Sequence, residues 1–269
     1  MTPAEVALVA ELAKAAAGLK IERDQVYAME SRLAPAARRA GFATISELLA
    51  AVRRGPDERL VWAVVESLLD LETGFFGDDG AFDRLAGELA AAPSAAPLRV
   101  LSAGCSGGQE LWSVALAMEE AAGPALSERL QLTGVDLSAR ALEKARAGLY
   151  TQFEVQRGLP IRLLVRHFER SQEMWAVPGR IRRLAEFRRV NLHAGLGGLG
   201  EFDAVVCRQV LRGLHPDAHG RLIDSLAAAV RPGGLLILGA GEAAAGAAGA
   251  LERVGEGLYR RRMQARAAA

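Results

Sequence analysis

A glycine-containing loop in the chain has the residue types that cofactor binding needs. The loop, Ala103–Gly108, follows a short apolar run, Leu98–Ser102, and precedes a helical segment, Gln109–Ala121. Glycine lets the backbone approach a ligand closely and adopt positive φ. Parallel sheets bind ligands just beyond the carboxyl end of the first strand. The loop is therefore either part of a ligand site or an ordinary tight turn.

Asp136 indicates what kind of ligand this would be. It ends a second apolar run, Leu130–Asp136, about 30 residues after the loop. A carboxylate there can accept hydrogen bonds from both hydroxyls of an adenosine ribose. NAD-dependent and S-adenosylmethionine-dependent proteins share this arrangement, and capping of the following helix is the alternative role for Asp136. The residues predict an adenosine cofactor without choosing its class.

The elements that must position the loop and Asp136 alternate between strand and helix. The second strand is followed by a helix with Ser138 as its N-cap candidate and Gly148 as its stop. Such alternation predicts a parallel sheet covered by helices. The remaining predicted elements are a strand at Phe202–Cys207, a helix at Pro216–Val230, a turn at Arg231–Gly234, and strands at Leu235–Leu238 and near Leu258–Arg260.

Segments outside this alternation predict additional units. Residues 3–71 have a helical pattern that predicts three or four short helices, and the last of these segments, from Val61 to Leu69, shows the three-and-four apolar spacing. We therefore expect an N-terminal helical domain over residues 1–90, with a small-residue linker to about residue 97. An α/β domain follows over residues 98–261, and residues 262–269 form a tail. Arginine-rich residues 150–189 interrupt the alternation and predict an inserted subdomain.

Composition excludes several classes of protein. Of 269 residues, 51% are hydrophobic and 24% charged, which is the balance of a folded globular chain. No run reaches the roughly 18 apolar residues of a membrane span, so we expect a cytoplasmic protein without membrane insertion. A net charge of +1 argues against nucleic acid as a partner. Cys105 and Cys207 are expected to be reduced core residues. Four histidines without metal-ligand spacing are expected at solvated positions, and no metal site is predicted: His167, His193, His215 and His219.

An ordered set of motifs resembles the CheR family, the S-adenosylmethionine-dependent enzymes that methylate glutamates of bacterial chemoreceptors. The stretch Gly107–Ser113 resembles the family's Gly-Glu-Glu-Pro-Tyr-Ser segment. Further matches follow at Thr73–Phe76, Leu142–Tyr150, Val190–Leu192, Phe202–Val210 and Arg231–Leu235. The resemblance extends from the N-terminal helices to about Arg261. It implies an α/β fold: a class I S-adenosylmethionine methyltransferase-type, mostly parallel sheet with an N-terminal helical domain and a small inserted β subdomain.

The resemblance also implies a site and a reaction. It places seven residues around S-adenosyl-L-methionine, whose product is S-adenosyl-L-homocysteine: Thr73, Glu110, Asp136, Asn191, Leu192, Arg208 and Gln209. Glu110 can accept from the cofactor's ammonium group, and Asn191 suits the adenine edge. A turn role for Asn191 and a core role for Leu192 are the alternatives. The accepting glutamate is already ionised near pH 7, so no general base is required and no catalytic residue is nominated.

Four positions depart from the family pattern. Leu71 and Gln209 each replace an asparagine, Gly77 stands where an arginine follows the Phe-Phe pair, and Gly213 stands where a tyrosine is expected. These changes predict cofactor binding with reduced methyl transfer. Restoring the family residues as Gly77→Arg and Gly213→Tyr is expected to raise the transfer rate more than the cofactor affinity.

Charge predicts where a receptor would dock. The stretch from Ser31 to Arg54 contains five arginines and only one acidic residue. We therefore predict that Arg32, Arg38 and Arg39 dock the cytoplasmic helical region of chemoreceptors. A plain solvated surface is the alternative. Relatives that grip a receptor tail carry a glycine-flanked loop in the insert, whereas the matching stretch here, Glu169–Trp175, is shorter and has no glycine. We therefore expect no tether for a C-terminal pentapeptide.

Two other functions remain open at this point. One is a catalytically weakened scaffold that binds S-adenosylmethionine or S-adenosylhomocysteine and acts in regulation. The other is a small-molecule methyltransferase built on the same sheet. Methyl-ester formation on a receptor fragment distinguishes protein-glutamate methylation from both.

Overall fold

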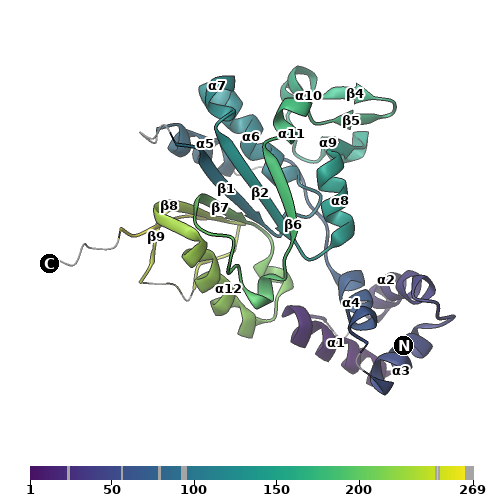
Figure 1. Cartoon of the computed structure of the whole chain (residues 1–269). Coiled ribbons are helices and arrows are strands. Elements are labelled where there is room, and N and C mark those ends of the chain that lie inside the picture. Colours follow the sequence, from purple (N-terminus) through teal and green to yellow (C-terminus); the bar gives the residue numbers. More distant parts are fainter. Residues whose placement is uncertain are drawn as a thin grey trace. The chain divides into compact units, whose positions relative to one another are not determined.

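The computed structural model describes residues 1–22, 25–55, 57–77, 80–91, 96–245, 247 and 249–263 (Figure 1). Residues 92–95 of the expected linker and 264–269 of the expected tail lie outside them. The chain forms two compact units. One consists of Met1–Asp70 together with Leu211–His219, and the other of Leu71–Val210 with the described residues from Gly220 onward.

The first unit is helical, as its apolar spacing predicts. Its helices are α1 (Pro3–Ala17), α2 (Val26–Arg39), α3 (Ile45–Arg54) and α4 (Glu58–Leu68). Three of them begin at a side-chain cap, because Thr2, Thr44 and Asp57 each accept a hydrogen bond from a backbone N–H of the first turn. Leu33 and Leu48 are fully buried in the core of this unit.

The boundary of the helical unit differs from the predicted residue 90. The unit's N-terminal part ends at Asp70, and α5 (Ala81–Ala90) packs against α6 (Gln109–Ala122) of the second unit. The helical unit also takes in a later segment that includes the 3-10 turn η2 (Leu211–Gly213). Here the Lys20 N–H donates to Gly213 O over 2.9 Å, and Leu214 forms a β-bridge with Leu19. These non-local bonds join segments that sequence spacing alone does not connect.

The second unit is built on a seven-stranded sheet in the order β6-β2-β1-β7-β8-β10-β9 (Figure 1). Its strands are β1 (Leu98–Ala103), β2 (Leu130–Asp136), β6 (Ala185–Arg189), β7 (Phe202–Cys207), β8 (Val230–Leu238), β9 (Leu251–Gly255) and β10 (Leu258–Arg261). The first five pair in parallel, and β10 runs antiparallel to β8 and β9. The mostly parallel sheet predicted from the sequence is confirmed.

Helices between the strands pack on this sheet. Helix α6 (Gln109–Ala122) contacts β1 and β2, and α8 (Ala139–Ala147) contacts β2 and β6. Ser138 caps α8 by accepting from the Ala141 N–H, and Gly148 ends it in the left-handed conformation, as predicted. The other helical elements of this part are α7 (Pro124–Ser127), η1 (Leu192–Ala194) and α12 (Pro216–Ala229).

The insert between β2 and β7 is smaller than predicted. It contains β3 (Leu149–Tyr150), α9 (Gln152–Gln156), α10 (Ile161–His167), β4 (Glu169–Ser171), β5 (Met174–Ala176) and α11 (Gly179–Arg182), and its three strands form a separate antiparallel sheet. The predicted range 150–189 extends too far, because β6 pairs with β2 in the large sheet. The predicted turn at residues 231–234 lies within β8, where the register with β7 shifts between Val230 and Leu235.

Two expectations about single residues have different outcomes. Cys105 and Cys207 are free and buried, as predicted, and burial raises the pKa of both thiols. His167 is not solvated, however, because its side chain is only 2% exposed between Glu119 and Glu120.

Within the described ranges, no group of three or more acidic, histidine or cysteine side chains could hold a metal ion. The helices described there are also too short or too polar to cross a membrane.

Candidate functional site

The loop after β1 has the backbone of a ligand-binding turn. Gly104, Ser106 and Gly108 all have positive φ, at 77°, 45° and 88°. The Gly104 N–H donates to Val135 O over 2.8 Å, which fixes the loop against the end of β2. A Cβ at Gly104 would lie 2.6 Å from Val210 Cγ2. Only glycine fits this position without displacing its neighbour.

Asp136 is buried beside this loop at the end of β2. One carboxylate oxygen accepts from the Ser106 N–H and the other from the Ser138 N–H, each over 2.8 Å. Burial raises the pKa of Asp136, and these backbone hydrogen bonds offset only part of that rise. Ser138, not Asp136, caps the following helix. Since each oxygen of a carboxylate has two acceptor sites, Asp136 can still accept from ligand hydroxyls.

Ser106 is a site residue that sequence reasoning missed. Its N–H holds Asp136, and its hydroxyl donates to Leu71 O over 2.8 Å, so it links the loop to the segment that begins the second unit. The signal in the sequence was its place in the Ala103–Gly108 loop, directly before Gly107.

Glu110 and Arg208 form an ion pair although they are far apart in the sequence. Arg208 Nη1 lies 3.3 Å from Glu110 Oε1, and their side chains are 8% and 14% exposed. The same nitrogen donates to Phe76 O over 3.3 Å, and the guanidinium lies over the Phe82 ring at 5.1 Å. Glu110 stands in the first turn of α6, while Arg208 directly follows β7. Two of the predicted site residues are thus in direct contact.

The other predicted residues lie at the ends of neighbouring elements. Asn191 accepts from the His193 N–H over 3.1 Å, so it has the turn role that sequence analysis considered. Leu192 is half-buried, and its Cδ1 lies 3.8 Å from the Cβ position of Gly104. Gln209 adopts a left-handed φ of 63°. Thr73 is half-buried, in the segment that leads to Phe76.

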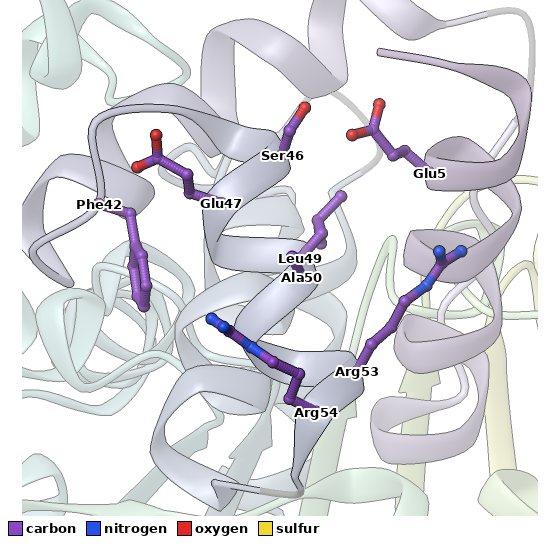
Figure 2. A pocket seen from close by; sticks show the side chains of 8 residues that line it. All are labelled: Glu5, Phe42, Ser46, Glu47, Leu49, Ala50, Arg53 and Arg54. Atoms are coloured by element: carbon purple, nitrogen blue, oxygen red, sulfur yellow. The ribbon is translucent and has the colours of Figure 1, made fainter.

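A pocket elsewhere does not coincide with this group of residues. Figure 2 shows it in the helical unit along α3, with a volume of about 540 Å³. Two of its lining carboxylates cap their own helices, since Glu5 accepts from the Thr2 N–H and Glu47 from the Ala43 N–H. Arg53 and Arg54 line its other end. None of the seven predicted cofactor residues lines it.

The acceptor groups beyond the carboxyl ends of β1 and β2 fit a ligand with ribose hydroxyls and an ammonium group. The carboxylates of Asp136, at the end of β2, and Glu110, at the start of α6, provide the acceptors for these groups. The glycine turn lets the backbone approach the ligand closely. These features define an α/β protein that binds an adenosine-containing cofactor. They do not by themselves distinguish a dehydrogenase from a methyltransferase.

Comparison with known proteins makes that distinction. Residues 71–257 match the family described as "CheR methyltransferase, SAM binding domain", and the chain belongs to this family. It is 33% identical over 244 residues to chemotaxis protein methyltransferase 1 of Vibrio cholerae, covering 88% of each chain. It is also 33% identical over 236 residues to chemotaxis protein methyltransferase 1 of Pseudomonas aeruginosa, covering 84% of this chain and 85% of that one. The protein is an S-adenosyl-L-methionine-dependent methyltransferase.

Proposed function

We propose that this protein is a protein-glutamate O-methyltransferase that modifies chemoreceptors, the methyl-accepting chemotaxis proteins. The main support is its similarity to chemotaxis protein methyltransferases over 88% of its length, a span too long for the cofactor-binding unit alone. The similarity therefore includes helical residues before Leu71. The proposal carries with it a cytoplasmic location, where receptor methylation helices are found.

We propose that the seven residues named above hold the cofactor. Asp136 would accept from the ribose hydroxyls, and Glu110, oriented by Arg208, from the ammonium group. Asn191 and Leu192 would face the adenine, while Thr73 and Gln209 complete the surroundings. The bound cofactor supplies an electrophilic methyl group. The residues of the chain align the acceptor and exclude water, and an ionised glutamate needs no base.

The receptor would dock on the arginines of α2. Arg38 and Arg39 are exposed in its last turn. Arg32 is exposed one to two turns earlier, and its Nη1 donates to Leu68 O over 3.0 Å, which holds its guanidinium at the end of α4. An acidic receptor helix would be attracted and oriented by these cations.

A radiolabelled transfer assay tests the proposed function. Wild-type protein with labelled S-adenosylmethionine should place base-labile label on the cytoplasmic fragment of a cognate chemoreceptor, and Asp136→Ala should place far less. Cofactor binding without any transfer to receptors from the same source would contradict the enzyme and support the regulatory scaffold. Label appearing only on a small acceptor would support the third alternative.

A further inference from the structure

Glu242 connects the carboxyl ends of two strands of the large sheet. It lies four residues after β8 ends at Leu238, and Leu238 pairs with Cys207 at the end of β7. Its Oε2 accepts from the Gln209 N–H over 2.9 Å and from the Gly239 N–H over 2.8 Å. One carboxylate oxygen thus holds the backbone that follows both strands.

The bond to Gln209 acts on a strained part of the backbone. Gln209 has a φ of 63°, in the left-handed region that disfavours residues with a Cβ. A charged acceptor makes a stronger hydrogen bond to an N–H than a neutral one does, so Glu242 can offset this strain. The packing is also close, because a Cβ at Gly239 would lie 2.8 Å from the Gln209 N.

The conformation of Gln209 determines where its neighbour points. Arg208 precedes it directly and reaches Glu110 Oε1 and Phe76 O. If residue 209 relaxed into an ordinary backbone conformation, the chain direction after β7 would change and Arg208 would lose this geometry. Glu242 therefore acts on the Arg208–Glu110 pair through the backbone of Gln209.

We propose that Glu242 is a positioning residue for the cofactor site: by binding the Gln209 and Gly239 N–H groups it fixes the left-handed turn that aims Arg208 at Glu110. The inference rests on the proposed function for its link to the methyl donor. Because both amides bind the same oxygen, a glutamine side chain can replace the contact with its single carbonyl oxygen. An alanine cannot.

The test compares Glu242→Ala and Glu242→Gln with wild type, using Glu256→Ala, exposed in the turn between β9 and β10, as the control. Hydrogen exchange of the Gln209 and Gly239 amides reports the contact, and calorimetry reports affinity for S-adenosylmethionine. Glu242→Ala should lose amide protection and bind the cofactor about tenfold or more weakly, because small misplacements of binding groups are costly. Glu242→Gln should stay within about threefold of wild type in affinity and keep most of the protection.

Three results would overturn this role. They are unchanged amide protection in Glu242→Ala, lost protection with unchanged cofactor affinity, and a Glu242→Gln variant as impaired as Glu242→Ala. Wild-type protein that binds no S-adenosylmethionine would instead overturn the proposed function, while the exchange data would still decide whether Glu242 holds the two amides.

Discussion

The guanidinium of Arg208 lies against Gly77: its Nη2 is 3.2 Å from the position that a Cβ on Gly77 would take. Gly77 has a φ of 76° as well. Gly77→Arg, expected from the sequence to raise the transfer rate, should therefore lower it. A side chain there costs about 1 to 2 kcal/mol of backbone strain, and two cations would compete for one place. Methyl-transfer kinetics and thermal unfolding measure both effects.

A matched glycine separates crowding from backbone strain. Gly41 has a φ of 86°, with no atom within 4 Å of its Cβ position. Gly77→Ala should lower the unfolding temperature more than Gly41→Ala does, because only Gly77 faces Arg208. A faster enzyme after Gly77→Arg would refute this account. Gly213 has open space at its Cβ position, so Gly213→Tyr should be accommodated there.

Asp136 should make cofactor binding sensitive to acid. Its pKa is raised above the ordinary value of 3.8, mainly by burial. The folded protein therefore takes up this proton at a higher pH than the unfolded chain does, and the stability contributed by Asp136 falls as pH rises between the two values. Cofactor affinity should do the reverse, weakening as pH falls through the raised pKa. Calorimetric titrations across this range should show the trend.

The variant Asp136→Asn supplies the control for that titration. It keeps an acceptor for one backbone N–H but cannot ionise. Its free energy of cofactor binding should therefore be less favourable by about 1 to 3 kcal/mol and should not change with pH in the same range. An equally strong pH dependence in Asp136→Asn would show that another group is titrating.

A charge cluster around the partly buried Glu120 should stabilise the insert against α6. Glu120 lies 3.1 Å from His167 Nε2, 2.9 Å from Arg162 and 3.0 Å from Arg166. Burial raises the pKa of Glu120, but the His167 hydrogen bond and the arginines outweigh it, so the net pKa is lowered. The stability contributed by ionised Glu120 is fully present above its ordinary pKa of 4.5 and is lost as pH falls through the lowered pKa of the folded protein.

Glu120→Gln should therefore destabilise the protein at neutral pH by about 0.5 to 1 kcal/mol, because solvent screens the exposed arginines, and should reduce the loss of stability in acid. Urea unfolding at pH 7 and near pH 4 measures both. Glu128→Gln, an exposed site at the end of α7, is the control and should have little effect. Equal midpoints for the two variants would rule out a stabilising role for the cluster.

Receptor binding should depend on the charge of α2. Reversing Arg38 and Arg39 together to glutamate should weaken association with an acidic receptor fragment by about tenfold and reduce its salt dependence. The same reversal at Arg253 and Arg262, both exposed in the second unit, controls for net charge. Surface plasmon resonance at two ionic strengths measures both effects. If the two double variants behave alike, the receptor docks on another surface.

The hairpin of the insert should not bind a receptor tail peptide. β4 and β5 are joined by only Gln172 and Glu173, and Gln172 has a φ of 56°. We expect fluorescence anisotropy to find no micromolar affinity for a C-terminal receptor pentapeptide. Tight binding that is lost after a change in β4 would show that this edge pairs with the peptide despite its short turn.

Sequence patterns located the buried strands better than the edge strands. The bounds of β2 and β7 agree with prediction, because both strands are mostly apolar and a polar residue, Asp136 or Arg208, marks where each one ends. β6 and β9 were not predicted. Each lies at an edge of the sheet and exposes charged residues, such as Glu186 and Glu252, so its sequence resembles that of a loop.

For the site, sequence supplied the residues but not their contacts. The motif order placed Glu110 and Arg208 near one cofactor, yet their ion pair depends on how α6 meets the end of β7. The link from Ser106 to Asp136 and the burial of His167 likewise arise from tertiary packing. Local periodicity carries no information about such pairings.

The chain crosses between its two units more than once, so one unit cannot be exchanged by recombination without part of the other. It passes between them at residues 70–71, 210–211 and 219–220. A recombination event that joined a foreign cofactor-binding sheet after Asp70 would also import a foreign version of Leu211–His219. That segment must still bridge Leu19 through Leu214 and accept the Lys20 N–H at residue 213. The helical unit is therefore not an exchangeable cassette, and changes in either unit are selected in the presence of the other.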